Sequence, residues 1–277
     1  DNSGTLKYVS LRHGGTDIGA GNEINGLTLG AVGNGTTFEY IEVISNIDDG
    51  VEFFGGAANM KYVLTAFVGD DSYDIDEGYH GKGQFLVTVQ GDNAGDRLGE
   101  NDGGPSDNEE GQPYANYTFY NCTYIGNGGD CLRLRDNVAG TYANSIFANT
   151  SKPIEVEYRE DKHNSYDMLK TEGLLVIKNN LFDNVGDGTV DGAMGIKEEK
   201  GTAPADAETV LTAHFNDNNN AIETTGVTVA NPVPASGSNN ATAALPSGDS
   251  FFSTADYHGA FQPGGNNWAK GWTLTFK

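Results

Sequence analysis

Basic residues are scarce in this chain. The 277 residues include 16 Lys and Arg against 39 Asp and Glu, which gives a formal net charge of −23 at pH 7. Such a surface repels phosphates and anionic headgroups, so the composition argues against nucleic acid and against an anionic membrane as partners. In a folded chain with this net charge the carboxylates also repel one another, and bound cations would relieve that repulsion.

Cysteine is scarce as well, and long apolar runs are absent. Cys122 and Cys131 are the two cysteines. A disulfide across a corner of the fold and two small core-filling residues are both compatible with their spacing. No apolar run approaches the roughly 18 residues of a transmembrane helix, so we do not expect membrane insertion. The sequence begins Asp1-Asn2-Ser3-Gly4 without a visible signal peptide, which we interpret as a processed or excised start.

A short pattern recurs along the sequence: two apolar residues, a polar pair that usually ends in Asn, a turn and a second strand. Copies begin at Val43, Thr65, Tyr124, Ile146 and Leu181. The steps from 43 to 65 and from 124 to 146 are 22 residues each, and a repeat of that length with strand chemistry indicates a solenoid. One position between the strands holds Asn46, Asn127, Asn149 and Asn184. Because Asn tolerates left-handed backbone, this column predicts an Asn ladder at a coil corner.

The repeat predicts an all-β fold, a right-handed parallel β-helix of about seven or more coils whose equivalent strands pair in parallel. We expect residues 1–230 to form this helix. Gly-rich and acidic stretches predict loop insertions at about 14–35, 91–112 and 158–172. Residues 231–277 predict an irregular extended segment and an aromatic C-terminal cap packed on the same domain. Residues 204–216 have the pattern of one or two helical turns.

Several blocks of the sequence resemble a widespread group of secreted bacterial β-helix proteins within the pectate-lyase-like superfamily, mostly described as surface or lipoprotein-like. The matching blocks are 6–15 (LKYVSLRHGG), 21–43 (GNEINGLTLGAVGNGTTFEYIEV), 46–56 (NIDDGVEFFGG), 69–85 (GDDSYDIDEGYHGKGQF) and 259–273 (GAFQPGGNNWAKGWT). The resemblance implies an exported β-helix protein, extracellular or on a bacterial cell surface. It implies no reaction.

The offset of 22 residues places the acids of one coil beside those of the next. The pairs are Asp48 with Asp70, Asp49 with Asp71 and Glu52 with Asp74, and Asp76 and Glu77 follow. Paired strands lie about 4.8 Å apart, so these carboxylates would repel one another unless a cation bridges them. Calcium takes six to eight oxygen ligands and suits such a cluster. The sequence therefore predicts a calcium site formed by these eight residues, and the alternative is a solvated acidic face.

Basic residues near these acids allow a different interpretation. Polysaccharide lyases combine calcium with a basic residue that removes an α-proton. Arg133, Arg135, Lys82 and His80 are the candidates for that role, with Lys152 as a further cation. The alternative is that the arginines pair with neighbouring acids across the strands. A pair of carboxylates could also hydrolyse a glycosidic bond. Whether the chain is an enzyme stays open.

The function that the sequence favours is a secreted, calcium-binding module of a bacterial cell surface or extracellular matrix, adhesive, glycan-contacting or structural. Its partner would be an extracellular polysaccharide or a surface component, and the module could belong to a longer chain or a filament. Exposed aromatics in the loops, such as Tyr79 and Tyr114, are candidate contacts. The alternative is a polysaccharide lyase or glycoside hydrolase acting in a groove. A cleft walled by the insertions at 91–112 and 158–172 would favour the enzyme.

Overall fold

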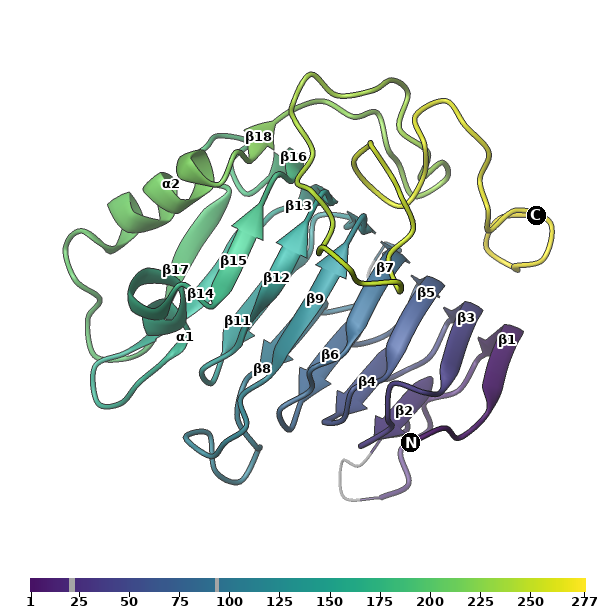
Figure 1. The fold of residues 1–277 in the computed structure, drawn as a ribbon, viewed down its shortest axis with the longest axis horizontal. Coiled ribbons are helices and arrows are strands. Elements are labelled where there is room, and N and C mark those ends of the chain that lie inside the picture. Colours follow the sequence, from purple (N-terminus) through teal and green to yellow (C-terminus); the bar gives the residue numbers. More distant parts are fainter. Residues whose placement is uncertain (20–22, 93–94) are drawn as a thin grey trace.

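The structure is a computed structural model that describes residues 1–19, 23–92 and 95–277. Two parallel β-sheets run along the molecule, one of 11 strands and one of seven. The first sheet contains β1 (Thr5–Arg12), β3 (Thr37–Ile44), β5 (Asn59–Ala66), β7 (Lys82–Val89), β9 (Asn116–Tyr120), β10 (Thr123–Ile125), β12 (Ala139–Ala143), β13 (Ile146–Thr150), β15 (Leu175–Lys178), β16 (Leu181–Val185) and β18 (Ala221–Ile222). The second sheet contains β2 (Leu27–Gly30), β4 (Val51–Phe54), β6 (Tyr73–Asp76), β8 (Arg97–Asp102), β11 (Asp130–Arg135), β14 (Ile154–Arg159) and β17 (Met194–Lys200). The chain passes from one sheet to the other and back, so that each coil adds strands to both (Figure 1). This is the all-β parallel β-helix that the repeat predicts.

In several neighbouring coils, residues that are 22 positions apart in the sequence lie opposite each other in paired strands. β4 pairs with β6 so that Glu52 lies opposite Asp74, and β11 pairs with β14 so that Arg133 lies opposite Glu155. The predicted pairing of Glu52 with Asp74 is therefore confirmed.

Each of the first seven coils bends at one residue with left-handed backbone between two stretches of the first sheet. In the first four coils this residue is aromatic: Tyr8, Tyr40, Tyr62 and Phe85 have φ angles of 56°, 55°, 57° and 61°. Their rings stack in a column with centroid separations of 4.6, 4.6 and 5.0 Å. In the next coils the register places Asn121, Asn144 and Asn179 at the bend, with φ angles of 55°, 54° and 51°. We call the four stacked rings the aromatic column.

The Asn ladder therefore lies at a corner other than the predicted one. β10 pairs with β13 so that Tyr124 lies opposite Phe147, one residue beyond the predicted partner. This shift removes Asn127 from the column of Asn149. Asn149 and Asn184 are still neighbours, with 3.4 Å between the Nδ2 atom of Asn184 and the Oδ1 atom of Asn149. The prediction of one ladder through all four residues was wrong, because one coil is a residue longer at this point.

Aromatic side chains fill the interior of the helix. The fully buried rings include Tyr73, Tyr117, Phe119, Tyr124, Tyr142, Phe147 and Phe182. Cys122 and Cys131 are buried beside them as free thiols. The structure therefore agrees with the interpretation of both cysteines as small core-filling residues and not with a disulfide.

The predicted insertions contain regular structure, so they are not simple loops. The segment 14–35 includes β2, and the segment 91–112 includes β8, which pairs with β6 and β11. The segment 158–172 holds a helical turn, α1 (Ser165–Asp167), that continues as the π-helical turn η1 (Met168–Glu172). These three predictions are corrected accordingly.

The strand β8 was not predicted because only Leu98 among its core residues is apolar, and two other inward positions hold Gly and Asn. Gly99 faces the core, where a Cβ atom would lie 3.2 Å from a methyl group of Leu132. Asn101 is fully buried and accepts a hydrogen bond from the Tyr142 hydroxyl at 3.2 Å. A strand with Gly and Asn at its inward positions lacks the alternation on which sequence-based prediction depends.

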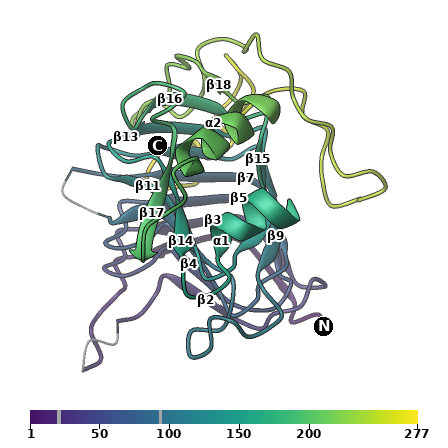
Figure 2. The same cartoon turned by 90° about the vertical axis from the view of Figure 1, so that its left-hand side faces the viewer.

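The helix α2 (Ala207–Asp217) covers the end of the β-helix that follows β17. Figure 2 views the molecule from this side, and α2 lies across the front. Leu211 and Phe215 are buried in the main core, and the Phe215 ring lies 5.1 Å from that of Phe182. The helix has 11 residues, about three turns, and is longer than predicted. Among the described residues no helix is long and apolar enough to cross a membrane.

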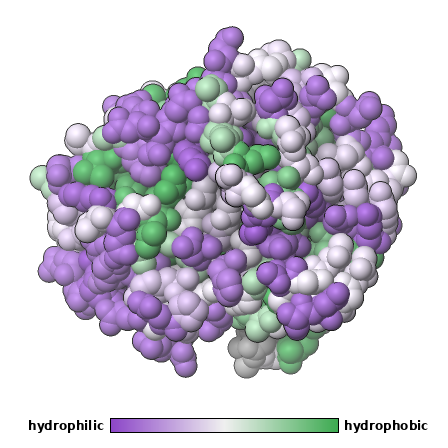
Figure 3. Space-filling view, in the orientation of Figure 1, coloured by the Kyte–Doolittle hydropathy of each residue, from purple (hydrophilic) through white to green (hydrophobic). Residues whose placement is uncertain are grey.

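The C-terminal segment, residues 223–277, lies along the outer side of the first sheet (Figure 1). Trp268 and Trp272 set their edges against the aromatic column, 5.4 Å from Tyr62 and 5.7 Å from Tyr8. Phe261, fully buried, packs with apolar side chains of the first sheet. The segment therefore packs on the same domain but covers a side of it, whereas α2 covers the end. Hydrophilic residues cover most of this view of the surface (Figure 3).

Candidate functional site

The outer side of the second sheet carries rows of charged residues. Alternation along β6 buries Tyr73 and Ile75 in the core and turns Asp74 and Asp76 outward. The row that contains Asp74 runs Thr28, Glu52, Asp74, Glu100, Arg133 and Glu155. We call this side of the second sheet, with the turns that enter its strands, the acidic face. Glu100 was not predicted as part of it, because β8 was expected to be a loop.

Six of the eight predicted metal ligands lie together on the acidic face. Three groups have carboxylate oxygens within 4.8 Å of one another: Asp48, Asp49 and Asp70; Asp49, Glu52 and Asp74; and Asp70, Asp71 and Asp96. Asp49 belongs to two groups, and its Oδ1 atom also accepts a hydrogen bond of 3.0 Å from the Asp71 amide. Asp96 was not predicted, because it lies just before β8. The groups share members, so the cluster is continuous over three coils.

The remaining two predicted ligands lie at the far end of the same strand. Asp76 is the last residue of β6, and one of its oxygens is buried without a hydrogen-bond partner among the described residues. Glu77 accepts hydrogen bonds from the Ser106 amide at 3.1 Å and the Ser106 hydroxyl at 2.9 Å. Neither belongs to the three groups, so the structure does not bring them together with the other six.

Burial makes the carboxylates of the cluster hard to ionise. Burial first, and neighbouring carboxylates next, raise the pKa of Asp49 to about 7 and that of Glu52 to about 8. The pKa of Asp74 is raised well above its ordinary value, again by burial first and by Asp49 next. Within the described part of the chain, no Lys, Arg or His forms an ion pair with these three acids, and the amide of Asn25 donates to Glu52.

Arginines neutralise the other half of the acidic face. Arg97 lies 2.8 Å from Asp96 and 2.9 Å from Glu100, and Arg133 lies 2.7 Å from Glu155. The face is therefore divided. Strands β8, β11 and β14 carry paired charges, while the acids of β4 and β6 form no ion pair with a cationic side chain of the described residues.

The four candidate lyase residues do not form one constellation. Arg135 lies 2.6 Å from Asp102 and 3.1 Å from Glu100. Burial alone would lower the pKa of this guanidinium, but the hydrogen bond to Asp102 and the surrounding acids raise it above its ordinary value. Lys82 stands at the start of β7 in the first sheet and is paired with Asp249. His80 precedes β7, with its Nδ1 atom 3.2 Å from the Gly78 oxygen.

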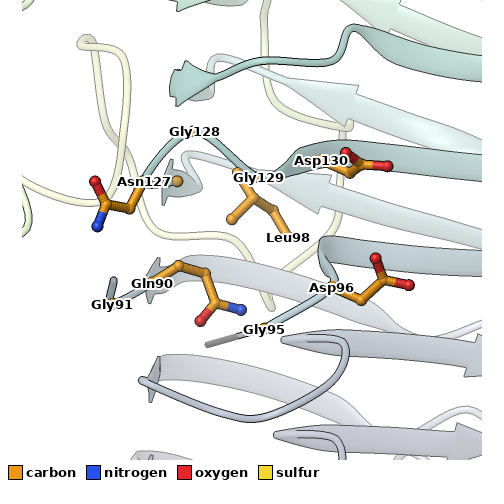
Figure 4. A pocket seen from close by; sticks show the side chains of 10 residues that line it. Gln90, Gly91, Gly95, Asp96, Leu98, Asn127, Gly128, Gly129 and Asp130 are labelled. Atoms are coloured by element: carbon orange, nitrogen blue, oxygen red, sulfur yellow. The ribbon is translucent and has the colours of Figure 1, made fainter. Parts of the chain in front are cut away.

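A small cavity of about 180 Å³ adjoins the third carboxylate group. Asp96 and Asp130 lie on one side of it and Gln90 and Asn127 on the other (Figure 4). Gln90 is 5% exposed, and its Oε1 atom has no hydrogen-bond partner among the described residues. The cavity therefore adds another oxygen acceptor next to the acidic cluster.

The two candidate aromatic contacts differ in exposure. Tyr79 is fully buried, and its hydroxyl donates to the Ala58 oxygen at 2.6 Å. The expectation that Tyr79 is exposed was wrong, because the ring packs on Phe53 in the core. Tyr114 is half-buried and lines a cleft at the start of strands β9 and β12 of the first sheet.

Fold and site together define a parallel β-helix protein whose second sheet has an acidic, partly uncompensated outer face. The chain belongs to the pectate-lyase-like β-helix family, since the family model described as "Pectate-lyase like beta helix domain" matches residues 1–273. The superfamily resemblance seen in the sequence is thereby confirmed. A search of curated proteins and a search of solved structures each gave no significant match.

Proposed function

We propose that this chain is a calcium-binding β-helix module of a bacterial cell surface or extracellular matrix, with an adhesive, glycan-contacting or structural role. The observation that carries the proposal is the group formed by Asp49, Glu52 and Asp74. Its carboxylate oxygens lie within 4.8 Å of one another, and no cationic side chain of the described residues is paired with them. Calcium suits such a group because it prefers several carboxylate oxygens and tolerates irregular geometry.

Electrostatics supports the same proposal. Without a cation, these acids must hold protons near neutral pH or repel one another, as their raised pKa values indicate. A divalent cation would replace those protons and neutralise charge on a chain whose net charge is −23. The extracellular assignment rests on the sequence resemblance, and millimolar calcium is available in that setting to a site of modest affinity.

The lyase alternative receives less support from the geometry. A catalytic base needs access to the proton of its substrate, whereas Arg133 and Arg135 are engaged in ion pairs with carboxylates at 2.7 Å and 2.6 Å. We therefore infer that these two arginines neutralise carboxylates of the acidic face.

A pair of thermal melts tests the proposal, one in excess chelator and one in millimolar calcium. A ligand that binds only the folded state stabilises it by about 2.7 kcal/mol at a hundredfold excess over its dissociation constant. We expect the melting temperature to rise by several degrees with calcium and not with magnesium at the same concentration, because magnesium sheds its water reluctantly. Equal melts in chelator and calcium would reject the proposal.

A further inference from the structure

A second site candidate lies at the corner where the strands of the second sheet lead into the first sheet. There the end of the segment 103–115 faces α1 and η1 across a cleft of about 330 Å³. We call it the insertion cleft. Its lining consists of Gln112, Tyr114, Asn116, Ala139, His163, Met168, Glu172 and Leu174. Figure 2 shows α1 on the flank of the coils, on the side of the end that α2 covers.

The walls of this cleft are fastened to each other. Glu109, from the first wall, is paired with Lys162 of the second wall and lies 3.4 Å from Arg159. The amide of Asn137 donates to the Glu109 oxygen at 2.9 Å, which ties the same wall to the turn before β12. A cleft fixed in this way is largely preformed, so binding a ligand costs little free energy for ordering the walls.

The lining combines an apolar floor with a polar rim. Met168 and Ala139 are buried beneath it, and Leu174 is 44% exposed although it is a large apolar residue. Tyr114 adds an aromatic ring. The amides of Gln112 and Asn116 offer both donors and acceptors at the rim. A small polyhydroxylated ring has a matching character, with a C–H face and a hydroxyl edge.

The rim of the cleft holds a pair of contacting polar side chains, His163 and Glu172. His163 lies 2.8 Å from Glu172 through its Nε2 atom, and its Nδ1 atom lies 2.6 Å from the Oδ1 atom of Asn137. Because the Asn137 amide nitrogen already donates to the Glu109 backbone oxygen, the Asn137 side-chain oxygen faces the imidazole. With an oxygen atom beside each ring nitrogen, the His163 ring is held between Asn137 and Glu172.

We propose that the insertion cleft binds one neutral sugar residue of a glycan. The proposal rests on the glycan-contacting part of the proposed function and not on its calcium site. A neutral sugar fits better than an acidic one, because Glu172 stands at the rim while Lys162 and Arg159 are already paired with Glu109. The volume suits a single ring, and Tyr114 and Leu174 supply the surface on which its C–H face rests.

Titration of the full chain with neutral oligosaccharides tests this site. The probes are disaccharides and trisaccharides of glucose, galactose, mannose and xylose, with trigalacturonate as the acidic comparison, each followed by saturation-transfer NMR in calcium and in chelator. We expect at least one neutral probe to bind, with affinity reduced about tenfold or more in Tyr114→Ala and Glu172→Gln. The control Ile222→Ala, a similarly exposed apolar residue outside the cleft, should bind like the unmodified chain.

The outcomes separate this proposal from the calcium site. Binding that persists in chelator and weakens in both cleft variants supports the cleft even if calcium does not bind. Glu172→Gln changes an exposed rim residue, so it keeps the test valid if Tyr114→Ala fails to fold. Absence of binding by every neutral probe, tighter binding of trigalacturonate, or binding that both variants leave unchanged would overturn the proposal.

Discussion

The carboxylate of Glu42 receives two hydrogen bonds from Thr275, 233 residues further along the chain: one from its amide at 2.9 Å and one from its hydroxyl at 2.8 Å. The amide of Leu274 donates to the same carboxylate at 3.0 Å. Glu42 is fully buried on β3, so these bonds replace the water that the charge would otherwise need. This contact anchors the end of the C-terminal segment to the first sheet.

Loss of this anchor should lower stability. In Glu42→Gln the bonds from Leu274 and Thr275 lose their charged acceptor, and a hydrogen bond to a charged group contributes about 1.5–3 kcal/mol, against about 0.5–1.5 kcal/mol for a neutral one. We expect the free energy of unfolding in urea to fall by about 2 kcal/mol. The control Glu39→Gln removes an exposed pair with Lys7 and should cost less than about 1 kcal/mol. Equal effects of the two substitutions would contradict the anchoring role.

The calcium-free protein should lose stability as the pH rises. Asp49 and Glu52 have ordinary pKa values of 3.8 and 4.5, which the fold raises to about 7 and about 8. Between these limits the folded chain holds more protons than the unfolded chain, so the free energy of unfolding falls with increasing pH. Melts in chelator at pH 5 and pH 8.5 should therefore show the higher melting temperature at pH 5.

The double variant Asp49→Asn, Glu52→Gln provides the matched control for this pH effect. It removes the two titrating groups, so its melting temperature should change less between pH 5 and pH 8.5. If the double variant showed the same pH dependence as the unmodified chain, the buried acids would not be its source.

Neutralising one ligand should have opposite effects with and without calcium. In chelator at pH 8.5, above the raised pKa of Glu52, Glu52→Gln removes a carboxylate that repels Asp49 and Asp74, so we expect a higher melting temperature than for the unmodified chain. In millimolar calcium the same variant lacks a ligand and should gain less from the ion. Asp217→Asn, an exposed acid on α2 outside the cluster, should behave like the unmodified chain in both conditions.

The two cysteines should be inert until the chain unfolds. Cys122 and Cys131 are free and fully buried, and burial raises the pKa of each thiol to about 12. Because the thiolate is the reactive form, a thiol reagent should modify neither residue in the native protein and both in denaturant. Rapid modification of the native protein at pH 8, or a failure to find two thiols in denaturant without reductant, would contradict the structure.

The sequence predicts those parts of the fold in which the repeat is regular. The register of Glu52 with Asp74 follows from the offset of 22 residues, and so does most of the acidic cluster. It could not place Asp96 and Glu100, because β8 turns Gly99 and Asn101 toward the core and so hides its strand character. An extra residue in one coil likewise displaced the predicted Asn ladder.

Other features depend on contacts between distant segments and carry no local signal. The insertion cleft forms only when the turn that holds His163 meets the loop that holds Tyr114. The sequence predicts that Tyr79 is an aromatic residue of a loop, yet the fold buries its ring against Phe53. The C-terminal segment is fastened to the first sheet in part by Glu42, whose partners Leu274 and Thr275 lie at the opposite end of the chain.

Calorimetric titration of the chelator-stripped protein with calcium is the most direct test of the acidic face as a metal site. We predict saturable binding of at least one ion at or below millimolar concentration, lost or strongly weakened in Asp49→Asn and Asp74→Asn and unchanged in Asp217→Asn. The absence of any calcium binding at millimolar concentration, or binding that the first two variants leave intact, would contradict this account of the acidic face.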